Sequence, residues 1–199
     1  MIEICGKGKK KELWVDGEFF CVINDFLILK YKLPQSSLSQ EKLNEIKNEA
    51  EVELGFSMAV DFVSRGSKTK KQVAEFLSKK ISKVNESVVL EKLLGYHYVD
   101  DLEFAKNFVD SKKSTCGKNK IRLALIQKGV SNEDIEKALV GLDNKEQAKK
   151  IADKYMRAKE MTRQNLEKLT RHLISKGFTW DEIAAVKRSY KEKIDESWD

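Results

Sequence analysis

One segment of this sequence brings together several carboxylates and an imidazole, the side chains best suited to chemistry. The segment from Gly95 to Asp101 reads Gly-Tyr-His-Tyr-Val-Asp-Asp, and Glu103 follows. Adjacent carboxylates on a chain point apart, and a hard cation needs more converging oxygens than these. Asp100 with Glu103 three residues later is typical of a helix N-terminus, where side-chain oxygens satisfy free backbone N–H groups. We interpret the cluster as helix capping.

Other signatures of catalysis are missing from the sequence. The two histidines, His97 and His172, have no partnered nucleophile. The three cysteines are far apart, and none has the spacing of a metal site, which fits a reducing cytoplasm. Gly6 and Gly8 lack the strand and helix that frame a phosphate-binding loop. The sequence therefore predicts no enzyme, no cofactor, no metal site and no small-molecule substrate.

Basic side chains are the better candidates for binding, because they recur in three runs of a chain with net charge +6. Residues 65–83 hold seven basic residues and one acidic residue. Residues 111–130 hold six basic residues and no acidic one, and residues 154–176 hold seven basic and two acidic residues. A lone run is usually a solvated helix face. Three runs in register favour a stripe that binds a phosphate backbone or an acidic protein surface. The candidate contact residues are Arg65, Lys79, Lys120, Arg122, Lys128, Arg163, Arg171 and Lys176.

Few aromatic residues interrupt the three runs, so the stacking of bases on aromatic side chains is not predicted. Trp14 and Trp180 are expected to be packing anchors, and Trp198 to lie in a frayed end. The sequence thus points to a surface recognised mainly by charge.

An internal repeat must position these runs. One helical marker occurs at intervals of 46 and 47 residues, as Met58-Ala59, Phe104-Ala105 and Ile151-Ala152. A second occurs at intervals of 49 and 48 residues, as Phe76-Leu77, Leu125-Ile126 and Leu173-Ile174. Repeats of this length, in which each unit must stack on its neighbours, are typical of helical solenoids.

Each repeat is predicted to contain three helices, and the basic run covers the second. The predicted caps of the third helices are Asn85, Ser131 with Asp134, and Thr179 with Glu182. Gly129 and Gly177 are placed where the second helix ends in a left-handed residue. Lys80 takes that place in the first repeat, which also carries three extra residues before its third helix.

The segment before the repeats is predicted to be extended at first and then helical. Glu12–Val15 and Glu18–Val22 flank Asp16-Gly17, a signal for a type I′ hairpin turn, and a third strand is expected at Phe26–Tyr31. A helical period then begins with Ser39 as N-cap and runs to about Arg65, with Gly55 as a tolerated weak point.

The predicted fold is mainly α, with tandem three-helix repeats forming an elongated curved solenoid behind a small β hairpin or three-stranded element. The expected segments are residues 1–38 (β element), 39–66 (long helix), 57–99 (repeat 1), 100–143 (repeat 2) and 144–199 (repeat 3). No apolar run is long enough for a membrane span, and no secretory signal is visible, so we expect a cytoplasmic protein without a membrane partner.

The same markers resemble those of the RecX family of recombination regulators. The matching segments are Arg65-Gly66-Ser67, Glu75-Phe76-Leu77, Gly95–Ala105, Lys128-Gly129-Val130 and Lys176-Gly177-Phe178. The junction from Tyr98 through Asp100-Asp101 to Phe104-Ala105 is the most specific, and the resemblance covers about residues 59–190. The hairpin and long helix resemble the N-terminal extension of some members, and the family has no active site to carry over.

The resemblance implies a modulator of DNA repair and the SOS response that binds the recombinase RecA on single-stranded DNA. Such a protein lies in the filament groove and restrains ATP hydrolysis, strand exchange and stimulated repressor cleavage; binding of double-stranded DNA is left open. An alternative is a direct DNA-binding regulator of helix-turn-helix type, which would bind a specific duplex without any recombinase. An enzyme acting on DNA ranks third, because the carboxylate or histidine cluster is missing.

Overall fold

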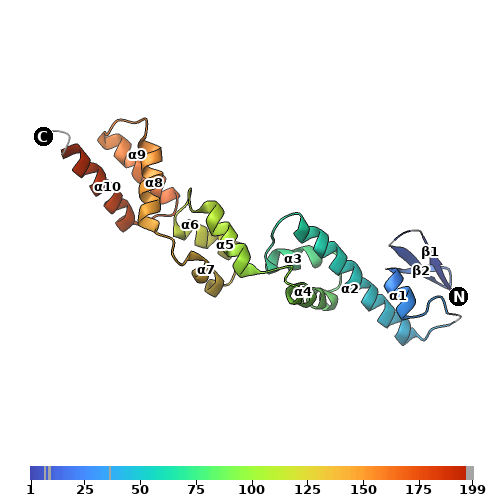
Figure 1. Ribbon diagram of the computed structural model, residues 1–199. Helices are drawn as coiled ribbons and strands as arrows, with labels where there is room; N and C mark the ends of the chain where they lie inside the picture. The colour runs from blue at the N-terminus through green and yellow to red at the C-terminus, as the bar shows by residue number, and fades with distance from the viewer. Residues whose placement is uncertain (7, 9, 36, 196–199) are drawn as a thin grey trace. The chain divides into compact units, whose positions relative to one another are not determined.

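The computed structural model describes residues 1–6, 8, 10–35 and 37–195, which form ten helices and a three-stranded N-terminal sheet (Figure 1). This confirms the mainly α fold with a small β element. The described chain divides into two compact units, which meet between Asp100 and Asp101 in the sequence. Among the described residues, no helix is long and apolar enough to cross a membrane. The elongated, curved arrangement expected for the repeats stays a prediction.

The N-terminal sheet is antiparallel, with strand order β1-β2-β3. Its strands are β1 (Ile2–Cys5), β2 (Lys11–Val15) and β3 (Glu18–Ile23). Between β2 and β3, Asp16 and Gly17 have φ values of 52° and 83°. Two successive positive φ angles are what a type I′ turn requires, so the hairpin prediction is confirmed.

The strand predicted at Phe26–Tyr31 is wrong, because these residues belong mainly to the short helix α1 (Asp25–Lys30). The Asn24 side chain accepts a hydrogen bond from the Leu27 backbone N–H at 3.0 Å, so it caps the helix. The third strand is instead β1, at the start of the chain. A local cap thus overrides the β propensity of a run rich in Phe, Leu and Ile.

The helix predicted from Ser39 is α2 (Gln40–Ser64), and the Ser39 side chain accepts from the Lys42 backbone N–H as expected. Gly55 is more than a tolerated weak point. A Cβ there would lie 2.8 Å from the end of the Ile81 side chain and 3.3 Å from the Val89 side chain. The missing side chain at Gly55 therefore lets residues from the end of repeat 1 pack directly on α2.

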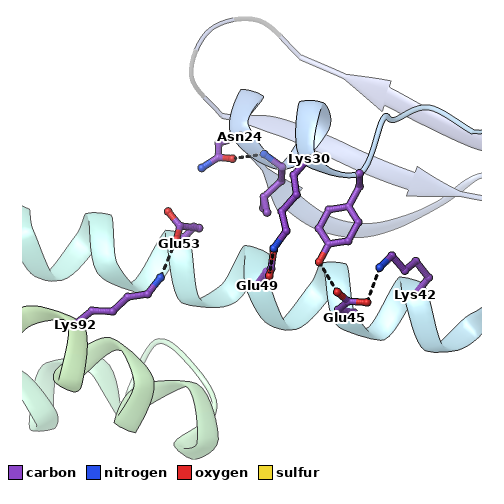
Figure 2. A network of polar contacts seen from close by, with 9 residues as sticks. Asn24, Lys30, Lys42, Glu45, Glu49, Glu53 and Lys92 are labelled. Atoms are coloured by element: carbon purple, nitrogen blue, oxygen red, sulfur yellow. Dashed lines mark hydrogen bonds and ion pairs between the residues drawn. The ribbon is translucent and has the colours of Figure 1, made fainter.

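Acidic side chains at four-residue spacing fasten α1 and α4 (Lys83–Gly95) to α2 (Figure 2). The Tyr31 hydroxyl donates to Glu45 at 3.0 Å, and Lys30 forms an ion pair with Glu49. Lys92 of α4 pairs with Glu53 at 3.1 Å. Because residues four apart share one side of a helix, a single row of carboxylates on α2 holds both neighbours.

Tyr31→Phe is expected to lower stability by about 1 kcal/mol at neutral pH, because the buried hydroxyl loses its bond to Glu45. Burial and the hydrogen bond to Glu45 raise the Tyr31 pKa above its ordinary value near 10. The hydroxyl's contribution is therefore complete below about pH 10 and is lost as pH rises through the folded pKa. Urea denaturation at neutral and alkaline pH should show a smaller alkaline loss for Tyr31→Phe than for the wild type. Equal losses of stability at alkaline pH in the two proteins would contradict the role given to the Tyr31 hydroxyl. The control is Tyr96→Phe, because the Tyr96 side chain is exposed.

In repeat 1, the cap assigned to Asn85 is wrong. Helix α4 begins at Lys83 with Ser82 as its N-cap residue, and Asn85 lies buried inside the helix, where its amide donates to Glu51. The expected three extra residues before this helix are also absent. The third helix of repeat 1, α4, has 13 residues, against 8 in α7 (Asn132–Leu139) of repeat 2.

Helix α4 ends in a left-handed residue that is not glycine. His97 has φ 56°, the His97 N–H donates to the Leu94 carbonyl, and the Tyr98 N–H reaches back to the Leu93 carbonyl at 2.9 Å. This hydrogen-bond pattern is a Schellman motif, in which glycine is the residue without steric cost at the left-handed position. His97 therefore strains the backbone.

His97→Gly is accordingly expected to stabilise the protein. Relief of the left-handed strain should raise the free energy of unfolding by about 1–2 kcal/mol. The greater conformational entropy of glycine in the unfolded chain should lower it by about 0.5–1 kcal/mol. The net gain of about 0.5–1 kcal/mol should appear as a higher urea midpoint. Gly95→Ala, two residues earlier at the last position of α4, is the control for altered glycine content. A lower midpoint for His97→Gly would contradict the strain.

The second unit contains two more three-helix groups. Their helices are α5 (Asp101–Lys112), α6 (Lys118–Gln127) and α7, then α8 (Asn144–Met156), α9 (Arg163–Ser175) and α10 (Trp180–Asp195). The caps predicted at Ser131 and Thr179 are confirmed, because each side chain accepts from the backbone N–H three residues later. Gly129 and Gly177 are left-handed, with φ 83° and 90°.

The buried side chains correct the register of the repeat. Leu77, Leu125 and Leu173 are completely buried at equal intervals of 48 residues, so Leu77 rather than Phe76 is equivalent to Leu125. In repeat 1 the turn after α3 (Lys70–Leu77) is one residue shorter, which removes the left-handed position that Lys80 was expected to fill. Trp180 is 69% exposed and is no packing anchor. Trp198 lies outside the described residues.

Candidate nucleic-acid and partner interface

The eight predicted contact residues lie where their basic runs place them, with seven on or just after the second helices and Arg65 just before the second helix of repeat 1. Arg65 follows α2 and Lys79 follows α3, and both are exposed. The remaining six are in the second unit, on α6 or α9 or at their C-terminal ends: Lys120, Arg122, Lys128, Arg163, Arg171 and Lys176. Whether these side chains contact a partner stays a prediction.

Lys120 and Lys176 are brought together at a joint between α6 and the end of α9. The Gly117 backbone N–H donates to the Lys176 carbonyl at 2.8 Å. The Lys120 ammonium donates to the Ser175 carbonyl at 2.9 Å, where it also faces the negative end of the α9 dipole. Lys120 therefore has a structural task that its charge pattern did not reveal.

Asn144 completes this joint, although no sequence pattern indicated its role. Its side-chain oxygen accepts from the Lys118 backbone N–H at 2.9 Å, and its amide donates to the Glu182 carboxylate. The residue is 9% exposed. One buried amide thus links the starts of α6, α8 and α10.

Arg122 is also engaged within the protein. Its guanidinium forms an ion pair with Glu136 of α7 at 2.6 Å, and its Nε is buried without a hydrogen-bond partner. Arg163 pairs with Glu167 at 3.4 Å, but its side chain is 94% exposed, so this pair contributes little. Of the candidates in the second unit, Arg163 and Arg171 present their charges most openly.

Aromatic rings lie beside the basic helices, contrary to what the runs alone indicated. Phe62, Phe108 and Tyr155 occupy equivalent positions on the first helix of the three repeats, at intervals of 46 and 47 residues, and all are half-buried. Each ring is stacked on a second ring and carries at least one lysine ammonium over it. Each ring lies four residues after the start of the first repeat marker, but only folding brings these rings to the lysines.

In repeat 1 the Phe62 ring stacks on Phe76 with centroids 4.4 Å apart and planes 3° apart, and the Lys68 ammonium lies 5.2 Å from the Phe62 centroid. In repeat 2 Phe108 lies 6.2 Å from the Phe104 ring. The Lys128 ammonium, from the predicted stripe, is 5.6 Å from the Phe108 centroid. Both sites combine a ring with a cation in the range of a cation–π contact.

In repeat 3 the partner ring is an imidazole. Tyr155 stacks on His172 with centroids 4.5 Å apart, and the Lys159 ammonium lies 3.0 Å from the Tyr155 centroid. Burial, together with the positive charges of Lys176 and Lys159, lowers the His172 pKa below its ordinary value. His172 is therefore neutral at physiological pH and stacks as an uncharged ring.

A metal-binding cluster finds no support in the described part of the chain. No group of three or more histidine, cysteine, aspartate or glutamate side chains there is arranged to hold a metal ion. Asp100 directly precedes α5, as the capping interpretation expects. The surface features that remain are cationic and aromatic.

These features define a class, the basic proteins built from three-helix repeats. Models of the second and third three-helix domains of RecX match residues 100–139 and 143–186. A "Regulatory protein RecX" of Leuconostoc mesenteroides is 34% identical, and the matched region covers 90% of this chain and 71% of that protein. A "Regulatory protein RecX" of Clostridium botulinum is 31% identical, and the matched region covers 93% of this chain and 92% of that protein. The chain belongs to the RecX family of regulatory proteins.

Solved structures share the fold. A crystal structure of a regulatory protein RecX superposes with a TM-score of 0.72 at 24% identity, covering 94% of this chain and 97% of that one. The crystal structure of RecX from Lactobacillus salivarius superposes with a TM-score of 0.63 at 24% identity. The superposed region covers 70% of this chain and 96% of that one. The similarity extends over the N-terminal unit in the first of these, since it spans nearly the whole chain.

Proposed function

We propose that this chain is a non-enzymatic cytoplasmic regulator that binds RecA recombinase filaments on DNA and inhibits their ATPase, strand-exchange and coprotease activities. Membership of the RecX family supports a regulatory role. The observation that carries the proposal is the recurrence of an exposed basic surface on the second helix of three successive repeats. A recurring charge of one sign suits a repetitive polyanion better than a single small ligand.

The test is DNA-dependent ATP hydrolysis by the cognate recombinase at fixed salt, while this protein is titrated in. We expect hydrolysis to fall at substoichiometric amounts, because a protein docked across protomers affects several active sites at once. Unchanged hydrolysis together with absent filament binding would contradict the proposal. Tight binding to one specific duplex without recombinase would favour the direct DNA-binding regulator instead.

A further inference from the structure

The ring and lysine clusters of the three repeats lie at the edge of the core, where each first-helix ring packs against the buried cluster of its own repeat and stays half-buried. A lysine stem lying over an aromatic face is an ordinary way to cover apolar surface while the charge stays in water. Here the first-helix ring (Phe62, Phe108 or Tyr155) occupies one equivalent position in all three repeats. Its partner ring comes from the second helix in repeats 1 and 3, as Phe76 and His172, and from the same helix in repeat 2, as Phe104. Different side chains that keep one ring-and-cation arrangement indicate a shared task.

We propose that each repeat holds one subsite for a nucleotide of single-stranded nucleic acid, in which the first-helix ring stacks a base and the neighbouring lysine binds its phosphate. The inference deepens the proposed function and rests on it for the biological source of the strand. In repeat 3 the subsite consists of Tyr155, His172, Lys159 and Lys176.

Binding exchanges one partner of the ring for another. In the free protein the Lys159 ammonium covers Tyr155. When a base arrives it replaces the ammonium on the ring, and the ammonium turns to the phosphate. Stacking of a base strengthens binding roughly ten-fold, whereas an exposed lysine–ring contact is worth about two- to five-fold. The exchange is therefore favourable, and the ammonium gains the phosphate as a charged partner.

The chemistry of the site favours a nucleic acid over an acidic protein surface. Carboxylates of a protein would need only the lysines and would leave Tyr155 and His172 without a role. A nucleotide uses both parts, because its base has a π-face and its phosphate a negative charge. His172, neutral because its pKa is lowered, adds an uncharged ring to the stack.

The chain provides its own reporters for a test. It contains two histidines, of which His172 lies in the subsite and His97 lies in the other unit. We would titrate the full-length protein with an oligothymidylate, without recombinase, and follow both imidazoles by NMR, with His97→Gln and His172→Gln for assignment. The His172 ring resonances should shift on binding while those of His97 stay in place. A silent His172, or no binding at all, overturns the proposal.

Variants separate stacking from charge. Tyr155→Leu keeps apolar bulk and should weaken oligothymidylate binding about ten-fold, while Tyr155→Phe keeps the ring and should bind as the wild type. Lys159→Gln should lower the slope of log affinity against log salt concentration by about one. Lys149→Gln, at an exposed position on α8, should leave this slope unchanged. Polyglutamate, a polyanion without bases, should bind Tyr155→Leu and wild type equally. If Tyr155→Leu weakens the binding of oligothymidylate and polyglutamate equally, base stacking on Tyr155 is contradicted.

The outcome is distinguishable from a failure of the proposed function. If oligothymidylate does not bind but recombinase ATPase is still inhibited, the subsite is wrong and the regulator stands. If oligothymidylate shifts His172 but the ATPase is unaffected, the subsite stands and the recombinase partner is wrong. Circular dichroism of each variant confirms that it is folded before binding is compared.

Discussion

Gly177→Ala is expected to destabilise the second unit by about 3 kcal/mol or more. A Cβ at Gly177 would lie 2.6 Å from both the backbone N and the Cβ of Lys120, which cannot move without shifting α6. The φ of +90° adds a conformational cost of about 1–2 kcal/mol. The two effects act together on the joint where the Gly117 N–H meets the Lys176 carbonyl. Urea denaturation followed by circular dichroism measures the loss.

Gly141→Ala is the matched control for this substitution. Gly141 is also left-handed, with φ +78°, but its added Cβ would meet nothing within 4 Å. It should therefore cost only the conformational part, about 1 kcal/mol. The difference between the two variants isolates the close approach of the backbones. Equal costs would show that α6 can yield and that the joint is loosely held.

Reversing three exposed charges is expected to weaken filament inhibition on the order of 100-fold. The structure selects Arg65, Lys79 and Arg171, because Lys120 and Arg122 hold contacts within the protein and their loss would confound folding with binding. In the triple variant Arg65→Glu/Lys79→Glu/Arg171→Glu, the slope of log affinity against log salt should also fall by about three. The inhibitor concentration that halves recombinase ATPase is the measurement.

A second triple variant separates the position of the charges from their sum. Lys106→Glu/Lys145→Glu/Lys149→Glu changes the net charge by the same amount at exposed sites outside the three basic runs. It should inhibit the recombinase nearly as well as the wild type. If both triple variants lose inhibition equally, overall charge rather than the stripe governs binding. If the first retains full inhibition while folded, the stripe is not the contact surface.

Local chemistry was readable from the sequence wherever neighbouring residues decide the structure. Asp16-Gly17 fixes the hairpin, because both positions need a positive φ. Ser39, Ser131 and Thr179 begin helices, because each side chain reaches an N–H three residues on. The errors at Phe26–Tyr31 and at Asn85 arose where the helix begins after a residue that the pattern had not singled out, Asn24 or Ser82.

The sequence by itself determined the helical repeat, the helix caps at Ser39, Ser131 and Thr179, and the basic runs, since these depend on residues within a few positions of one another. Only the tertiary structure decided what each charge does. Lys120 is 55 residues from Ser175, whose carbonyl binds its ammonium. Phe62 and Phe76 stack from different helices. Such contacts depend on how helices pack, and periodicity along the chain determines which face is buried without specifying which side chains meet across it.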